Sequence, residues 1–363
     1  MSARQKQILL GVFLVIILAL AVFAVVNRNL FIRPAAPVAS APGDTQPIID
    51  AFNANDFAGA IAGANAQLAA DPNNIQALLL KAGTLAQQGS LTFNEREYAL
   101  QAIDIAHQVL ALDPKNDEAW RIIGYANEIM QNYSEAHAAY NQSLIFNPHN
   151  ALTLFDNGHA WDLQGQADKA EAGYRAAIAV NPNLDMAHIG LGRILIRKND
   201  LPAATREFQQ ALSLTSNTRT KAEILSSLGS IQMSTDLSAA QKYFQQATVA
   251  DPHYPNGWAG LGTVIFDQAL TAGTPPATQA SLIQTSLNNL DTAIKLNPNL
   301  SSAHIQFAIE FAVIGQVSDA IGILNKTKRI VPNDITLSAS DKAATLQQID
   351  TLEASFTVAL SKK

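Results

Sequence analysis

The sequence predicts an all-α fold, a solenoid of about eight helical hairpins, and three observations point to it. First, the chain from Asp117 to Leu184 repeats itself at an offset of 34 residues. Second, apolar and small residues within each copy stand three or four positions apart, as the buried face of a helix requires. Third, each copy ends in a proline, where a helix has to stop. A repeat array grows by adding neighbours, so 363 residues predict one long array rather than several domains.

Five positions carry the repeat. They are Trp120 and Leu154, Gly124 and Gly158, Ala136 and Ala170, Tyr140 and Tyr174, and Pro148 and Pro182. The small residues allow the two helices of a hairpin to approach closely, and we expect each tyrosine to fill the space beside them. Each copy is therefore predicted to be one helical hairpin.

This pattern over 34 residues resembles the tetratricopeptide repeat (TPR) family. The resemblance implies a right-handed superhelical solenoid of about eight TPR helix-turn-helix repeats. It also implies that the first helix of each hairpin lines a concave groove, and that the groove binds other proteins. Architecture follows from the resemblance much more directly than activity does.

The array is expected to occupy residues 47–334. Its first repeat looks truncated, because Pro47 to Phe52 is too short for a full first helix. Longer turns between helices are expected around Gly89 to Glu97 and Thr271 to Ser281. Residues 335–363 are predicted to form a C-terminal capping helix and tail.

The N-terminal part predicts a membrane anchor. A short basic tail, residues 1–7, precedes Ile8 to Val26, which carries no charged residue and would reach about 28 Å as a helix. We therefore predict a transmembrane helix at 8–26, with a cleaved signal peptide as the alternative. Residues 27–46 form a linker rich in Pro and Ala.

The distribution of basic residues sets the expected orientation. Arg4 and Lys6 precede the predicted span, which favours an N-terminus in the cytoplasm. The prediction is a single-pass protein of the cytoplasmic membrane with its repeats outside, in the periplasm or another extracytoplasmic space.

Composition excludes several classes of function. The net charge of −6 argues against a nucleic-acid backbone as the main partner. The chain has no cysteine, which excludes disulfides, thiolate zinc sites and cysteine nucleophiles. The seven histidines offer no pair at metal-binding spacing, and His188 and His304 take the place that tryptophan holds in other repeats. We predict no enzyme, no metal and no cofactor.

The resemblance implies that nine residues line the groove. These are Arg121, Ile122, Tyr125, Glu128, Phe155, Asp156, His159, Arg193 and Arg197. Aromatic side chains supply contact area at low entropic cost, and arginine supplies a planar fork of hydrogen-bond donors. Such a mixture suits an extended or helical peptide. The alternative is an ordinary polar solenoid face with no partner at these positions.

The function predicted from the sequence is a non-catalytic, membrane-tethered scaffold that assembles or stabilises a cell-envelope complex through protein–protein contacts. Two alternatives remain open: an accessory subunit of an enzyme system for polysaccharide or lipid-linked glycan, and a factor for c-type cytochrome maturation or pilus assembly. The sequence leaves the partner and the oligomeric state open.

Overall fold

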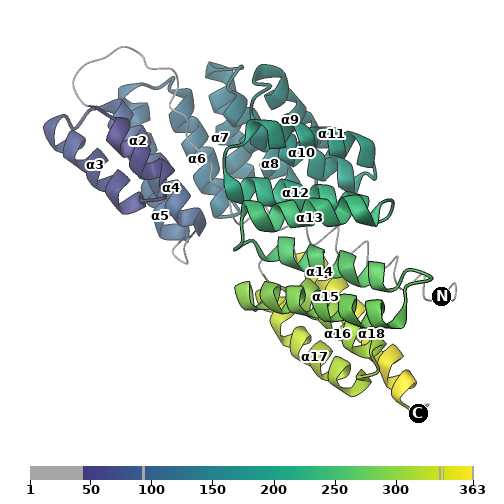
Figure 1. The fold of residues 1–363 in the computed structure, drawn as a ribbon. Helices are drawn as coiled ribbons and strands as arrows, with labels where there is room; N and C mark the ends of the chain where they lie inside the picture. Colours follow the sequence, from purple (N-terminus) through teal and green to yellow (C-terminus); the bar gives the residue numbers. More distant parts are fainter. Residues whose placement is uncertain (1–43, 92–94, 335–336, 338, 362–363) are drawn as a thin grey trace. The chain divides into compact units, whose positions relative to one another are not determined.

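The computed structural model describes residues 44–91, 95–334, 337 and 339–361. In this part of the chain it contains seventeen α-helices, one short 3-10 helix and no strand (Figure 1). The predicted all-α, TPR-like solenoid is confirmed.

The helices follow one another as eight pairs and a final helix. Their bounds are α2 Gln46–Asn53, α3 Phe57–Ala70, α4 Ile75–Leu91, α5 Glu95–Leu112, α6 Asp117–Ile129, α7 Tyr133–Phe146, α8 Ala151–Leu163, α9 Ala167–Val180, α10 Asp185–Arg197, α11 Leu201–Leu214, α12 Thr218–Gln232, α13 Leu237–Ala250, α14 Pro255–Ala269, α15 Pro276–Leu296, α16 Ser301–Val313, α17 Val317–Ile330, η2 Val331–Asn333 and α18 Ala339–Leu360.

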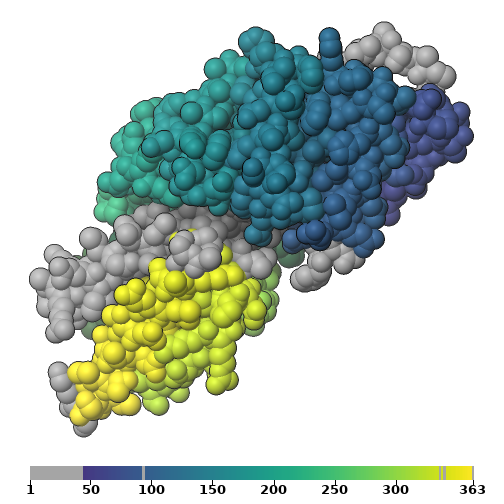
Figure 2. Space-filling view, turned by 180° about the vertical axis from the view of Figure 1, so that it is seen from behind, coloured from purple at the N-terminus to yellow at the C-terminus, as the bar shows by residue number. Residues whose placement is uncertain are grey.

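Two compact units share these helices, with their boundary inside α10. The described residues 44–194 form the N-terminal unit, and the described residues from 195 onward form the C-terminal unit. Within the N-terminal unit each helix from α2 to α9 packs against the next, and α6 also contacts α4 and α8. These helices present a continuous surface in the space-filling view (Figure 2). Within the C-terminal unit α14 contacts α12, α13, α15 and α16 in the same manner. The first helix of one pair therefore lies beside the first helix of the next pair.

All of the turns between hairpins except that between α11 and α12 hold an Asp or Asn directly before proline. These residues are Asp71, Asp113, Asn147, Asn181, Asp251 and Asn297. The N–H of each donates to the carbonyl four residues earlier and ends the preceding helix. In all of them except Asn147, the side-chain oxygen also accepts from the backbone N–H two residues later. The sequence pairs Asp-Pro and Asn-Pro therefore fix where one hairpin ends and the next begins.

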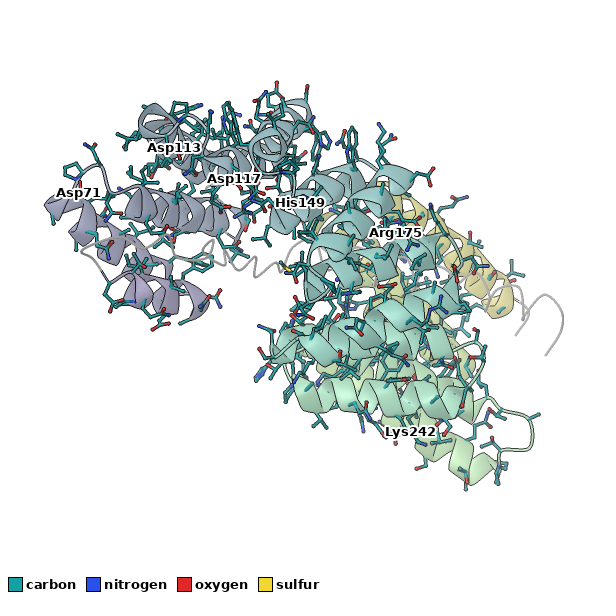
Figure 3. All side chains as sticks on the ribbon, turned by 90° about the horizontal axis from the view of Figure 1, so that it is seen from above. Asp71, Asp113, Asp117, His149, Arg175 and Lys242 are labelled. Atoms are coloured by element: carbon teal, nitrogen blue, oxygen red, sulfur yellow. The ribbon has the colours of Figure 1, made fainter. Side chains whose placement is uncertain are left out.

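Asn147 uses its side chain to join two repeats. Its Nδ2 donates to Asp117 Oδ2 at 2.8 Å, and Asn150 Nδ2 donates to the same oxygen at 2.9 Å. Figure 3 shows Asp117, the first residue of α6, near the turn that holds His149. In the C-terminal unit, Ser301 at the start of α16 likewise donates to Asp334. The start of a first helix is thus tied to the turn one repeat later.

The turns inside the hairpins depend on a left-handed residue. Positive φ angles occur at Asn55, Gln131, Gly165, Asn199 and Gly315, each just after a first helix. Residues in this conformation end a helix and redirect the chain, and glycine adopts it at the least cost.

The close packing of helices that was predicted at the small residues is confirmed only in part. A Cβ on Gly124 would lie 2.5 Å from the ring of Tyr140, so this tyrosine fills the predicted space. At Gly158, however, a Cβ would meet the backbone of Gly173 at 3.2 Å. The ring of Tyr174 lies instead against Gly190 of the next pair, where a Cβ would approach to 2.7 Å. The second tyrosine therefore also packs against the next repeat, in addition to its contact with Phe155 in its own hairpin.

The predicted transmembrane helix at 8–26 lies outside the described residues. Among the residues that the structure does describe, no helix is long and apolar enough to cross a membrane. The longest ones, α15 and α18, each bury one side and expose polar residues on the other, whereas a bilayer core requires about twenty mostly apolar residues. The described residues thus give no support to the predicted localisation, a single-pass protein of the cytoplasmic membrane with its repeats outside, and the relatives described below contradict it.

Candidate partner-binding face

Seven of the nine predicted site residues lie on α6 and α8. Their exposed fractions run from 0% for Asp156 to 6% for Tyr125 and His159. Arg193 on α10 is partly buried, and Arg197 is exposed and belongs to the C-terminal unit. The sequence placed these side chains on the lining of a groove, whereas the structure buries those on α6 and α8 and joins them to one another.

Arg121 is the centre of a charged contact between α6 and α8. Its Nη1 lies 2.7 Å from Asp156 Oδ2, and its Nη2 lies 2.6 Å from Glu118 Oε1. Its Nε also donates to Glu118 Oε2 at 2.9 Å, so the contact with Glu118 is bidentate. Burial alone would lower the pKa of Arg121, but Glu118 and Asp156 hold that pKa well above its ordinary value. Arg121 thus remains a cation inside the protein.

Glu128 is the centre of a second polar contact, about two turns further along α6. His159 Nδ1 on α8 lies 2.7 Å from Glu128 Oε1, and Tyr140 on α7 donates its hydroxyl to Glu128 Oε2 at 3.1 Å. Burial, together with the charge of Glu128, raises the pKa of Tyr140 well above its ordinary value. One carboxylate therefore connects the second helix of its own pair with the first helix of the next.

The remaining aromatic site residues extend these contacts in both directions. Tyr125 donates its hydroxyl to Gln87 Oε1 on α4 at 3.4 Å. The ring of Phe155 lies 5.6 Å from that of Tyr174 and 6.4 Å from that of His159. The contacts of the predicted residues on α6 and α8 thus reach three consecutive first helices, α4, α6 and α8.

Sequence reasoning missed three members of this set, Gln87, Glu118 and Tyr140. Glu118 stands three residues before Arg121, a spacing that brings opposite charges together on a helix and could have indicated the pair. Tyr140 was assigned a packing role, and no local pattern reveals that its hydroxyl binds Glu128. The described residues contain no group of three or more His, Cys, Asp or Glu that could hold a metal ion.

Comparison with known proteins agrees with this architecture. Residues 160–217 match the family model described as tetratricopeptide repeat. Anaphase-promoting complex subunit 3 of Schizosaccharomyces pombe is 25% identical over 113 residues, which cover 31% of this chain and 17% of that protein. Anaphase-promoting complex subunit CDC16 of Saccharomyces cerevisiae is 23% identical over 250 residues, which cover 66% of this chain and 28% of that protein. The chain thus matches only a minor part of each relative.

A solved structure shows the same fold. The crystal structure of the APC/C hetero-tetramer Cut9-Hcn1 superimposes with a TM-score of 0.59 at 18% identity, covering 83% of this chain and 55% of that one. The curated relatives are named as subunits of the anaphase-promoting complex, which also goes against the predicted membrane localisation. Residues 160–217 therefore match the tetratricopeptide repeat model, and the described chain has an all-helical, TPR-like solenoid fold.

Proposed function

We propose that the chain is a non-catalytic scaffold that binds an extended segment of a partner protein along α6, α8 and α10 and holds that partner in a larger assembly. The observation that carries the proposal is the buried pair of Arg121 and Asp156 between two first helices, 2.7 Å apart.

This pair is not needed to close a hairpin. Packing within a hairpin uses small and aromatic residues such as Gly124 and Tyr140, which lie against each other without any charge. A buried ion pair adds little net stability compared with apolar side chains of the same volume, because both charges lose their hydration. The charges between first helices are therefore better explained by a role in positioning these helices than by a contribution to the stability of the fold.

The two charged contacts fix the first helices relative to one another. Arg121 joins α6 to α8 at one level, and Glu128, about two turns further along α6, joins the same helices through His159. A rigid face binds a partner with less loss of conformational entropy than a mobile one. Of the nine residues predicted from the sequence, the seven on α6 and α8 are buried and would support the face. Arg193 is the member on the N-terminal unit whose side chain is only partly buried, so it is the proposed contact with the partner.

The similar proteins support an assembly role. Two relatives are named as subunits of one complex, and TPR proteins bind protein or peptide partners. This likeness is consistent with the predicted absence of catalysis. From these relatives we adopt only the class of function, and the partner has to be identified by experiment.

Photo-cross-linking from single positions tests this proposal. p-Benzoylphenylalanine replaces Arg193 in one variant and Arg175 in the other, and cross-linked products from irradiated cells are identified by mass spectrometry. Arg175 is the matched control because it lies on a second helix of the same unit with its side chain 55% exposed. We expect a defined protein adduct from position 193 that is absent from position 175. Equal adducts from both positions, or none from position 193, would contradict the proposal.

A further inference from the structure

Glu310 breaks the repeat pattern. In the first helices α6, α8, α10, α12 and α14, the residue two positions after the small packing residue is apolar and buried. These residues are Ala126, Ala160, Ile194, Ile231 and Val264. In α16 this position holds Glu310, which is 0% exposed. Its neighbour on α15 changes as well, because Ser286 stands where the other second helices carry alanine.

The carboxyl group of Glu310 has fewer hydrogen bonds than it can accept. Ser286 shares one hydroxyl proton between Glu310 Oε1 and the carbonyl oxygen of Gly262, each 2.7 Å away. Gln306 Nε2 donates to the same Oε1 at 3.3 Å. Glu310 Oε2 is buried and has no hydrogen-bond partner among the described residues. A buried carboxyl oxygen without a donor is costly, which makes this atom a place where a ligand donor would be favourable.

Asp267 on α14 adds a second carboxyl group. It is partly buried, and its charge acts on Glu310 across the contact of α14 with α16. No hydrogen bond or ion pair joins its side chain to another described residue. Burial raises the pKa of Asp267 to about 7 and that of Glu310 to about 8, as expected for carboxyl groups that lack a cation.

Among the residues that the structure describes, no lysine or arginine is a cause of the raised pKa values of these two groups or offsets them. The sequence from Pro255 to Asn325 contains one lysine, Lys295, and no arginine. Lys295 is already paired with Asp291 at 2.6 Å, on the exposed side of α15. His304 on α16 lies with its Nε2 3.0 Å from the carbonyl oxygen of Pro298, and burial lowers its pKa.

We propose that Asp267 and Glu310 form a recognition site for a lysine or arginine side chain of a bound peptide. A guanidinium or ammonium group supplies both the N–H donors and the positive charge that the two carboxyl groups lack. A metal ion fits less well, because the described residues hold no group of three or more metal-ligating side chains. The site shares the premise of a peptide-binding scaffold with the proposed function, but it lies on other helices, α14 and α16.

A phage-displayed library of random decapeptides, selected on the intact chain, tests this site. We expect lysine or arginine to be enriched at one position of the peptides that bind. A selected arginine peptide and its citrulline analogue, which is uncharged, are then compared by fluorescence anisotropy. We expect the citrulline peptide to bind at least about tenfold more weakly to the unaltered chain, and equally well as the arginine peptide to Asp267→Asn or Glu310→Gln.

Two controls separate recognition from folding and from general charge. Asp319→Asn removes one negative charge from an exposed position of α17 and should leave the preference for arginine unchanged. Glu310→Val restores the apolar residue found at this position in α14, so it should retain or raise the melting temperature while losing the preference. Selected peptides without a basic residue, or equal losses for Asp319→Asn and Asp267→Asn, would overturn this site and leave the proposed function standing. Selection of no peptide at all would overturn both.

Discussion

Trp258 Nε1 donates a hydrogen bond to the carbonyl oxygen of Pro252, 2.8 Å away. The same relationship, six residues apart, joins His304 Nε2 to Pro298 O and His188 Nε2 to Pro182 O, each at 3.0 Å. A carbonyl oxygen only accepts, so Nε2 carries the proton in both histidines. The Trp or His ring near the start of a first helix therefore holds the preceding turn by a hydrogen bond to its proline carbonyl. This contact explains why histidine can replace tryptophan there, in agreement with the predicted packing role of His188 and His304.

Substitution of Trp258 measures how much this hydrogen bond contributes to the stability of the fold. Trp258→Phe removes the N–H donor, and we expect a loss of about 0.5–1.5 kcal/mol in the free energy of unfolding beyond the effect of the smaller ring. Trp120→Phe is the matched control, because Trp120 Nε1 is buried without a hydrogen-bond partner. Urea denaturation of both variants checks the difference, and a larger loss for Trp120→Phe would refute the role of the bond.

Breaking the buried ion pair should be costly. Arg121→Met leaves the carboxylate of Asp156, whose side chain is 0% exposed, without its arginine partner. We expect a loss of about 3–5 kcal/mol in the free energy of unfolding. Arg175→Met breaks an exposed pair with Glu171 and should cost less than about 1 kcal/mol. Chemical denaturation distinguishes the two, and similar losses would mean that the Arg121 pair is solvated.

Two glycine substitutions should have opposite effects. Gly165 has φ of +73°, so Gly165→Ala forces a side chain into the left-handed region and should destabilise the protein by about 1 kcal/mol. Gly322 lies within α17, where an added Cβ meets nothing within 4 Å, and Gly322→Ala should stabilise by about 0.5–1 kcal/mol. Thermal melts of the two variants should therefore shift to opposite sides of the unaltered protein. A shift in the same direction would refute the conformational argument.

Because the pKa values of Asp267 and Glu310 are raised, we predict that the free energy of unfolding falls as pH rises. The pKa of Glu310 is about 8 in the folded protein against 4.5 for the exposed group, so the folded state binds more protons than the unfolded state in between. The stability that the neutral carboxyl provides is complete below pH 4.5 and is lost as pH rises through about 8. Asp267 acts in the same direction up to about pH 7.

Glu310→Gln isolates this contribution, because the amide keeps the shape and does not ionise. Urea midpoints between pH 5 and pH 9 should fall more steeply for the unaltered chain than for the variant. The lowered pKa of His304 acts in the opposite direction below the ordinary value of 6.5 and is present in both proteins, so it cancels in the comparison. Parallel pH profiles would show that Glu310 does not titrate in this range.

The helices and their turns were predictable from the sequence because their causes are local. The 34-residue period identified the hairpins, and the Asp-Pro and Asn-Pro pairs marked turns that are closed by bonds spanning only two to four residues. The residues that the resemblance assigned to a groove lie on the first helices α6, α8 and α10, and their role in binding stays a prediction. Their burial could not be predicted, because it depends on which helices pack around α6.

Contacts between residues of different repeats were decided by the tertiary structure alone. Arg121 and Asp156 are 35 residues apart, and Glu128 and His159 are 31 apart, so no local period pairs them. Glu310 was visible in the sequence as a departure from the apolar register, yet its unsatisfied oxygen and its coupling to Asp267 appear only when α14 and α16 lie side by side. The sequence by itself determined the hairpins, since their hydrogen bonds form within one stretch of chain. Tertiary packing decided which charges are desolvated and which partners they find.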